Sequence, residues 1–487
     1  MTQTEKQTPP EAFSTARLVA IIGTLAVAAF VMILNETVLT VALPSLMADF
    51  SISAATAGWF TTGFLLTMAI CIPLTGYLMQ RFSMKSLFLT AIALFGIGTL
   101  VAALALNFET MLIARIVQAL GTAVIMPLLM TTTLHLVPAQ HRGSIMGLNA
   151  VVLSVGPAVG PTVAGIVINA ISWHALFWGM AAFAVLAFAA GLVSLPSGKG
   201  RPAGRLDAFS ILLSIIGFGG FVYGVSSVSQ VIEGDFLPLV AIVIGLIALA
   251  FFVRRQNALV RKQSAPLLHL APLKNSAFNR SVIIIAIAFG AMLGSVVVLP
   301  VYLENGLGLN PASVGLALLP GGLIQAVISP IAGRIFDRKG PRPLVIPGAV
   351  LLSAGQWGLA TSGADTPVWL VITCHTVFGA GMALVMASMM THSLGSLARE
   401  MYGHGSAIVN TLQQLAGAIG TALFLTAFGL GMSLAGSTED AVRYPFVVGG
   451  ILTLVAVVLA FTIKANRPEP VVLEASTKAD TGMVTTG

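Results

Sequence analysis

Glu36 is the acidic and Arg115 the basic side chain that lies inside a long apolar stretch of this 487-residue chain. The other acidic and basic residues fall in connections or near the ends of such stretches. A carboxylate removed from water favours its protonated form, and a nearby cation favours the charged form. Glu36 could therefore take up and release a proton or neutralise a cationic substrate, with Arg115 shifting the balance. The structural alternatives are a permanently paired acid and an arginine bonded to backbone carbonyls.

His375 is a third polar group deep in an apolar stretch, where a neutral imidazole could pass a proton or serve only as a hydrogen-bonded packing residue. Further polar or aromatic side chains could line a substrate cavity, although each alone is more often a polar contact between helices. The cavity candidates are Asn35, Gln118, Asn149, Gln325, Gln356, Trp357, His375, Asn410, Gln413 and Gln414.

The composition is that of a membrane protein. Hydrophobic residues make up 57% and charged residues only 8% of the chain, whereas soluble domains carry about 25% charge. This excludes a soluble enzyme, a disordered protein and an ordinary nucleic-acid binder. The sequence contains no phosphate-binding Gly-x-x-x-x-Gly-Lys-[Ser/Thr] loop, and its two cysteines form no ligand cluster. We therefore expect no ATP-driven pumping, no cofactor and no metal site.

Long unbroken apolar runs predict membrane-spanning helices, because a β-barrel would need short segments of alternating polarity. The first run, from Leu18 past Pro44, is too long for a cleavable signal. Fourteen spans are predicted, at about 17–46, 56–80, 86–107, 110–136, 143–169, 173–195, 208–230, 236–254, 279–304, 312–336, 342–362, 366–394, 403–432 and 442–464.

The basic residues sort to one side of this topology. All except Arg115 and Arg443 fall at the chain ends or at the connections that lead from an even-numbered span to the next odd-numbered one. Lysine and arginine accumulate in cytoplasmic loops, so both termini are predicted to be cytoplasmic in a multi-pass plasma-membrane or inner-membrane protein. Attraction to anionic membrane lipids is a second expected use of this charge.

An internal repeat indicates two halves. Pro73, Gly76, Arg81 and Lys85, at the end of span 2, recur with the same spacing as Pro330, Gly333, Arg338 and Arg342, at the end of span 10. Parallel repeats of this kind form the halves of large transporters, with the substrate site between them. The predicted organisation is a cytoplasmic tail (1–16), a six-helix bundle (17–196), two inserted helices with cytoplasmic linkers (197–277), a second six-helix bundle (278–464) and a disordered tail (465–487).

Several motifs together resemble those of one transporter family. They are Asn35-Glu36-Thr37 with Val41–Pro44, the turns Gly76–Lys85 and Gly333–Arg342, the span-4 run Leu112–Gly121, and Gly156–Pro161 with Gly165. The chain resembles the fourteen-span drug:proton antiporters of the major facilitator superfamily. The resemblance implies an all-α major facilitator fold and a proton-handling role for Arg115. Asn35 stands where the family usually has Asp, and Gln80, Ser83 and Met84 depart from its first turn motif.

Two further sets of residues receive expected roles. Gly156, Pro157, Gly160, Pro161 and Gly165 would allow close packing and bending of span 5, as a hinge or as ordinary small-residue packing. A cytoplasmic gate of state-dependent ion pairs is expected around the repeated turn, although plain topology charge explains the same residues. Its members are Gly76, Arg81, Lys85, Gly333, Asp337, Arg338, Gly340 and Arg342.

The expected function is proton-coupled antiport that exports small amphipathic or hydrophobic compounds by alternating access, as in multidrug efflux and antibiotic resistance. The alternatives are transport of one specific metabolite or lipid, in either direction, and a membrane-embedded enzyme, which would need more convergent ionisable groups than Glu36, Arg115 and His375. The expected partners are a small-molecule substrate, protons and membrane lipids, without nucleic acid, and the chain is expected to be a monomer.

Overall fold

The computed structural model describes residues 14–197, 206–228, 231 and 234–464, and within these ranges the chain forms helices, turns and loops without a strand. The first part contains α1 (Thr15–Phe50), α2 (Ala54–Ala57), α3 (Trp59–Arg81), α4 (Met84–Ala103), α5 (Phe108–Leu136), η1 (Ala139–His141), α6 (Arg142–Ala170) and α7 (Trp173–Ser194). The middle part contains α8 (Ala208–Ser214), η2 (Ile215–Gly219), α9 (Gly220–Ser226) and α10 (Leu237–Arg261). The last part contains η4 (Ala271–Lys274), α11 (Ser276–Val301), η5 (Tyr302–Gly306), α12 (Pro311–Lys339), α13 (Arg342–Ala360), α14 (Val368–Gly395), η6 (Arg399–Met401), α15 (Tyr402–Ala435), α16 (Thr438–Ala441) and α17 (Arg443–Phe461).

Thirteen helices of the described chain are long and apolar enough to cross a membrane. The predicted span 7 is one of them, with η2, a π-helical stretch, between α8 and α9. The 29-residue α6, where span 5 was predicted, is not among the thirteen, so the count of fourteen stays a prediction. The predicted tails 1–16 and 465–487 and the linker at 197–207 lie largely outside the described residues.

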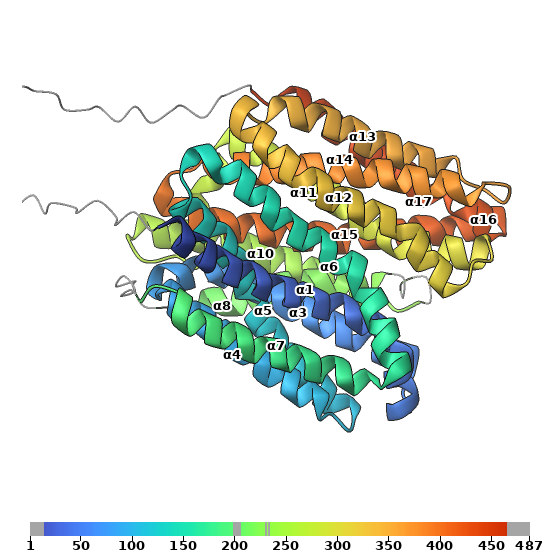
Figure 1. Ribbon diagram of the computed structural model, residues 1–487, viewed down its shortest axis with the longest axis horizontal. Helices are drawn as coiled ribbons and strands as arrows, with labels where there is room; N and C mark the ends of the chain where they lie inside the picture. The colour runs from blue at the N-terminus through green and yellow to red at the C-terminus, as the bar shows by residue number, and fades with distance from the viewer. Residues whose placement is uncertain (1–13, 198–205, 229–230, 232–233, 465–487) are drawn as a thin grey trace, which may run out of the picture.

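The helices pack as two groups that meet along two seams (Figure 1). The N-terminal group is α1 and α3–α7, and the C-terminal group is α11–α17; α4 packs on α5 and α7, and α13 on α14 and α17, within their own groups. One seam joins α6 to α12, and the other joins α3 and α5 to α15. The predicted division at 17–196 and 278–464 remains a proposal.

The two ends of the bundle differ in charge. We call the end where α3 finishes at Arg81, α6 begins at Arg142 and α12 finishes at Lys339 the basic end, and the opposite one the far end. The described chain also starts and finishes at the basic end, because α1 begins there and α17 runs back to it (Figure 1).

The inserted helices cover the seam between α3 and α15. Gly217 lies against Leu249, and Gly224 against the backbone of α10, so α8–α9 and α10 pack closely together. The Ser214 hydroxyl donates to the Ile70 carbonyl of α3 at 3.2 Å, and α9 also contacts α15. At the far end Trp59 stacks on Tyr223 with ring centroids 5.9 Å apart. The pair is therefore attached to both groups.

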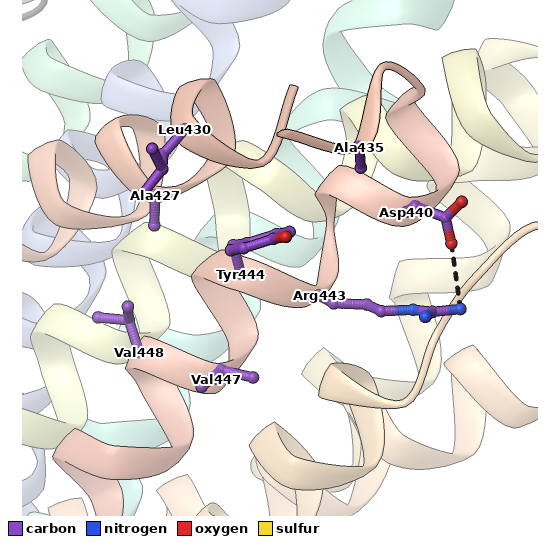
Figure 2. A pocket seen from close by; sticks show the side chains of 8 residues that line it. All are labelled: Ala427, Leu430, Ala435, Asp440, Arg443, Tyr444, Val447 and Val448. Carbon is purple, nitrogen blue, oxygen red and sulfur yellow. Dashed lines mark ion pairs between the residues drawn. The ribbon is translucent and has the colours of Figure 1, made fainter. Parts of the chain in front are cut away.

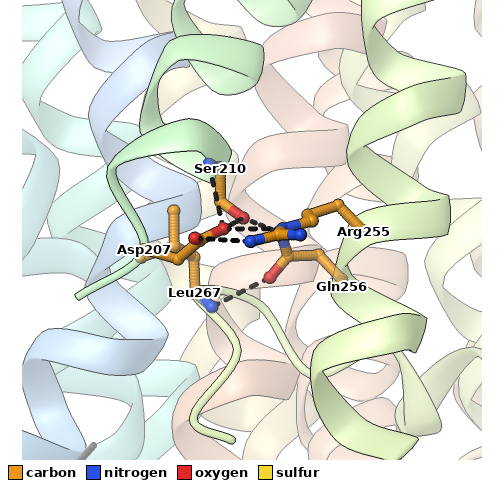
Figure 3. A network of polar contacts seen from close by, with 5 residues as sticks. All are labelled: Asp207, Ser210, Arg255, Gln256 and Leu267. Atoms are coloured by element: carbon orange, nitrogen blue, oxygen red, sulfur yellow. Dashed lines mark hydrogen bonds and ion pairs between the residues drawn. The ribbon is translucent and has the colours of Figure 1, made fainter. Parts of the chain in front are cut away.

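A polar network joins α8, α10 and the chain that follows α10 (Figure 3). Asp207 caps α8, accepts hydrogen bonds from Ser210, and forms a two-bond ion pair with Arg255 at 2.9 and 3.0 Å. Gln256 donates to the Ser210 hydroxyl and accepts from the Leu267 N–H. Hydrogen bonding to the Arg255 guanidinium lowers the pKa of Asp207 to about 2.

The Asp207 charge is expected to stabilise the protein by the same amount at pH 5 and pH 8. A depressed pKa contributes stability above the unfolded value near 4, and this is lost only as the pH falls toward 2. Asp207→Asn keeps the helix cap but removes the ion pair, so Tm should fall by roughly 1–3 °C at both pH values. Asp235 is an exposed acid at the far end of the inserted helices, and it forms no ion pair among the described residues. Asp235→Asn should therefore leave Tm unchanged. A fall in Tm for Asp207→Asn that is present at pH 8 and absent at pH 5 would contradict this account.

Candidate transport site

Arg115 is a fully buried cation within α5. Its Nη1 donates to Gln118 Oε1 at 2.8 Å, its Nε donates to the Phe60 carbonyl at 3.4 Å, and its guanidinium lies 4.2 Å from the Phe64 ring centroid. A buried charge is costly unless hydrogen bonds and opposite charge compensate it. These contacts, together with a cation–π interaction, stabilise the arginine within the N-terminal group.

Gln118 connects this cation to α1 and α4. The Asn35 amide on α1 and Gln118 exchange hydrogen bonds at 3.3 and 3.5 Å, and Gln118 donates to the Thr99 hydroxyl on α4 at 2.9 Å. All four side chains, Arg115 included, are fully buried. The network therefore positions the turn of α1 that carries Asn35 against the buried cation.

Glu36, the next residue on α1, lies at the edge of this network. Its side chain is half-buried, and its carboxylate interacts electrostatically with Arg115. Within the described ranges no hydrogen bond or ion pair to the Glu36 carboxylate is formed. The carboxylate therefore remains available to a proton or a cationic group while its counter-charge is held nearby.

The glycine motif of α6 packs on the same turn of α1. A Cβ at Gly156 would come 2.7 Å from the Ile33 side chain, and one at Gly160 would overlap the Thr37 hydroxyl. Gly165 has open space around its missing Cβ, so it has no packing role of this kind. Pro157 and Pro161 lie in α6, but their side chains are outside the described part. Close backbone approach thus links α6 to the residues on either side of Glu36.

At the basic end, α6 meets α12 through the Asp337 carboxylate. It accepts hydrogen bonds from the Gly143 N–H at 2.7 Å and from the Ser144 N–H at 2.8 Å, and the Ser144 hydroxyl adds a third at 2.5 Å. The first N–H groups of a helix have no partner within it and carry partial positive charge, which suits a carboxylate. Gly143 and Gly333 bring the two backbones together, because a Cβ on either would meet the other's chain.

We expected ion pairs among the predicted gate residues, but the Asp337 carboxylate instead binds the N-terminus of α6. Arg338 and Arg342 are exposed, and Lys85 donates to the Leu192 carbonyl within the N-terminal group. Arg81 is exposed at the end of α3, and Gly340 ends α12 with a positive φ of 75°. Backbone N–H groups need no ordering of a long side chain, which favours this arrangement over a surface ion pair.

The first copy of the repeated turn makes a different contact. Gln80, which occupies the place of Asp337, lies with its amide nitrogen 2.9 Å from His404 Nε2 on α15. Gly76 allows this approach, since a Cβ there would come 2.5 Å from the His404 ring. Nearby, Arg142 donates to the Tyr402 hydroxyl at 3.1 Å. Both seams are therefore bonded at the basic end.

The remaining cavity candidates separate into two kinds. Asn149 donates to Thr133 within the N-terminal group, Gln356 donates to Ser295 within the C-terminal group, and Trp357 packs on Gly450. These contacts are those of packing residues. Gln325, His375, Asn410, Gln413 and Gln414 lie on the helices α12, α14 and α15 that border the seams, and all but the buried Gln413 are half-buried.

Among these residues on the seam helices, His375 has a buried ring nitrogen without a partner in the described chain, and Gln414 contacts the other helical group. His375 packs against Gly321 of α12, and its Nδ1 is buried without a partner in the described chain. Gln414 reaches Met68 of α3 at 3.8 Å, which is a contact between the two groups. Gln325 and Asn410 instead donate to carbonyls of their own helices.

A hollow of about 620 Å³ lies away from these residues, at the far end between α15 and α17 (Figure 2). Its walls are mainly apolar and include Tyr444, beside the exposed ion pair of Asp440 and Arg443 at 3.1 Å. It contains none of the predicted site residues. No group of three or more His, Cys, Asp or Glu side chains in the described ranges could hold a metal ion.

Sequence reasoning missed Thr99, Ser144 and His404 as members of these contacts. Thr99 and Ser144 carry no signal beyond their polarity. His404 could have been found from the repeat, because it is the third residue of α15 as Ser144 is of α6, each helix following a short 3₁₀ turn. The residue opposite Gln80 was therefore predictable from the residue opposite Asp337.

Two helical groups that meet along two seams, with a buried polar network inside one group, are the architecture of a polytopic membrane protein. The Major Facilitator Superfamily model matches residues 25–421, and the chain belongs to this superfamily.

Relatives and solved structures agree with that assignment. The chain is 37% identical over 474 residues to the lincomycin resistance protein LmrB of Bacillus subtilis, covering 94% of this chain and 98% of that protein. It is 37% identical to LmrB of Listeria monocytogenes (88% and 90% covered) and 28% identical to a multidrug resistance protein B homolog of Mycobacterium tuberculosis (80% and 72%). The proton:xylose symporter XylE shares the fold with a TM-score of 0.67 at 16% identity, covering 93% of this chain and 97% of that one.

Gly160→Ala is expected to disturb the Glu36 turn, whereas Gly165→Ala should not. The added methyl at Gly160 overlaps Thr37, so α6 must move off α1, while the methyl at Gly165 meets open space. We expect Gly160→Ala to lower Tm measurably, in line with the roughly 1–3 kcal/mol of overpacking, and Gly165→Ala to be neutral. Thr37→Ala combined with Gly160→Ala should recover part of the loss in a double-mutant cycle. Equal Tm values for the two single variants would refute the close-packing account.

Proposed function

We propose that the chain is a proton-coupled antiporter that exports small amphipathic or hydrophobic compounds by alternating access. One observation carries the proposal: a half-buried Glu36 carboxylate, without a bonded partner in the described chain, lies beside a fully buried arginine network. Ionisable residues at membrane depth generally mark substrate or proton pathways. The resistance proteins among the relatives support export of drug-like compounds as the substrate class.

The direct contacts between the groups support a state that is closed at the basic end. Hydrogen bonds join α12 to α6 at Asp337, α3 to α15 at Gln80, and α5 to α15 where Ser406 meets the Pro127 carbonyl. The deepest of these contacts is Gln414 with Met68. If the basic end is cytoplasmic, as its excess of lysine and arginine favours, Glu36 in this state exchanges protons with the outside.

In the proposed cycle, Glu36 takes up a proton from outside as substrate leaves. The two helical groups then rearrange while Glu36 is protonated. Glu36 releases its proton toward the cytoplasm before the next substrate binds. Arg115 stays in place because the Gln118 side chain, the Phe64 ring and the Phe60 carbonyl hold it, so its fixed charge favours proton release whenever Glu36 approaches. Substrate and proton then occupy the site in alternation.

Helix α6 supplies the mechanical link between gate and proton site. Its first residues bind Asp337 and pack on Gly333, and its middle packs on either side of Glu36. A displacement of α12 from α6 at the basic end must therefore shift α6 against α1. Coupling needs a physical element that both sites bias, and α6 contacts both.

Glu36→Gln is expected to abolish pH-driven transport and to spare substrate exchange. The amide keeps the shape of the acid but cannot release a proton, so the variant in proteoliposomes should lose at least about tenfold of the lincomycin or hydrophobic-cation flux that an imposed pH gradient drives. Exchange of labelled for unlabelled substrate needs no net proton movement and should continue. The measurement is flux with and without the gradient, using a panel of cationic and neutral drugs.

Glu109→Gln, the same change at an exposed acid in the first turn of α5, is the matched control and should behave as the wild type. Gradient-driven flux that survives in Glu36→Gln would remove Glu36 from the coupling mechanism. Wild-type flux that ignores the gradient for every compound would overturn antiport itself.

A further inference from the structure

The segment 262–275, which connects the inserted helix α10 to α11, crosses the basic end and is called the strap below. Leu267 and Leu268 are almost fully buried, and their N–H groups donate to Gln256 Oε1 at 2.9 and 3.3 Å. They belong to one cluster of buried side chains that includes Tyr77 of α3 and Tyr402 of α15. The strap is thus anchored among residues of both helical groups rather than lying loose on the surface.

The next residue of the strap bonds to the gate. The His269 N–H donates to His404 Nδ1 at 3.2 Å, and the two rings lie 5.9 Å apart. His404 is 1% exposed, so this bond is shielded from water. The strap also bends back on itself at this point, because the His269 ring accepts from the Ala271 N–H at 3.2 Å. Burial and the nearby Lys274 charge lower the pKa of His269, which keeps that ring nitrogen an acceptor.

The strap bond determines the tautomer of His404. A neutral imidazole has one acceptor and one donor nitrogen, and Nδ1 already accepts from the strap. Nε2 therefore carries the hydrogen, and its neighbour Gln80 must present the amide oxygen at 2.9 Å, the amide orientation being interchangeable by a flip. One ring then holds α3 of the N-terminal group and the strap of the inserted pair at the same time.

The two seams of the gate are related by the internal repeat but are closed by different chemistry. On the α12–α6 side, the Asp337 charge binds the first N–H groups of α6 directly. On the α3–α15 side, Gln80 replaces the charge and His404 replaces Ser144. A neutral amide gains less from a helix N-terminus than a carboxylate does. The strap supplies an additional bond on the side that lacks the charge.

We propose that the strap is a third gating element: it holds the α3–α15 seam closed at the basic end through His404 and must release before that end opens. Its segment belongs to the inserted helices, which gives the pair a role in the conformational cycle. His404 acts as a positioning residue in this device, and the group of His269 that bonds to it is the backbone N–H. The inference rests on the alternating access proposed above, but not on the identity of the proton site.

The test compares two substitutions at one position in the full chain. His269→Pro removes the donating N–H, whereas His269→Asn keeps it, and the asparagine side-chain oxygen can still accept from the Ala271 N–H two residues on. Spin labels at the exposed positions Gln140 and Glu400, one in each helical group at the basic end, report the separation of the groups in nanodiscs. Cys71 and Cys374 are replaced by Ser in every variant so that only the labels react.

We expect His269→Pro to raise the ratio of open to closed distances about fivefold, the shift that loss of one net hydrogen bond produces, and His269→Asn to leave it near the wild-type value. Asp337→Asn, which weakens the other seam, is the reference for opening. A distance distribution for His269→Pro that matches the one for His269→Asn overturns the strap. If Asp337→Asn opens the basic end in the same experiment, alternating access stands without it.

A second pair of variants covers the case in which His269→Pro does not fold. In His404→Asn the amide oxygen can occupy the Nδ1 position and keep the strap bond, whereas His404→Gln reaches Gln80 but leaves the strap N–H without an acceptor. Hydrogen–deuterium exchange of a peptide spanning 265–271 should be faster by about fivefold in His404→Gln only. Equal exchange in both variants refutes the strap.

Discussion

Holding one full positive charge at membrane depth is the constraint around which the N-terminal group is organised. Arg115 is fully buried, and its guanidinium is satisfied by Gln118, the Phe60 carbonyl and the face of Phe64. Gln118 has to accept from the arginine and exchange bonds with Asn35, which determines how closely α1 approaches α5. The placement of Glu36 beside this network follows from that approach. A carboxylate in this position has a fixed counter-charge nearby, and no residue of the described chain forms a bond that would hold it in one protonation state.

Close backbone contact carries the influence of this site to the basic end. Gly156 and Gly160 place α6 on the turn of α1 that holds Glu36, while Gly143 and Gly333 place the start of α6 on α12. The same helix is thus in contact with the Glu36 turn of α1 and with the Asp337 cap. Side chains at these positions would hold the helices apart, and a packed helix moves as a unit rather than bending freely. The glycine motif and the gate motif therefore serve one mechanical element.

The two copies of the repeated turn differ in sequence, yet each makes a contact across a seam. The second copy keeps its acid and uses the unpaired N–H groups of α6. The first copy has Gln80, and its contact with α15 passes through a buried imidazole that also binds the chain following the inserted pair. The inserted helices pack on α3 and α15, so they accompany the seam whose gate contact has lost its charge.

Much of this architecture is written in local properties of the chain. Long apolar runs have to become helices in a bilayer because each backbone polar group must be satisfied within its own segment, and lysine and arginine mark the cytoplasmic connections. Glu36 and Arg115 are recognisable from the sequence as well, because a charged residue within an apolar run is evident from residue types alone. The partners of these groups were not readable in this way. Thr99 beside Gln118, the α6 N–H groups around Asp337, and the strap on His404 depend on which helices meet and at what height. Hydropathy places a residue at a depth in the membrane, but only the packing of helices distant in sequence determines what lies beside it at that depth.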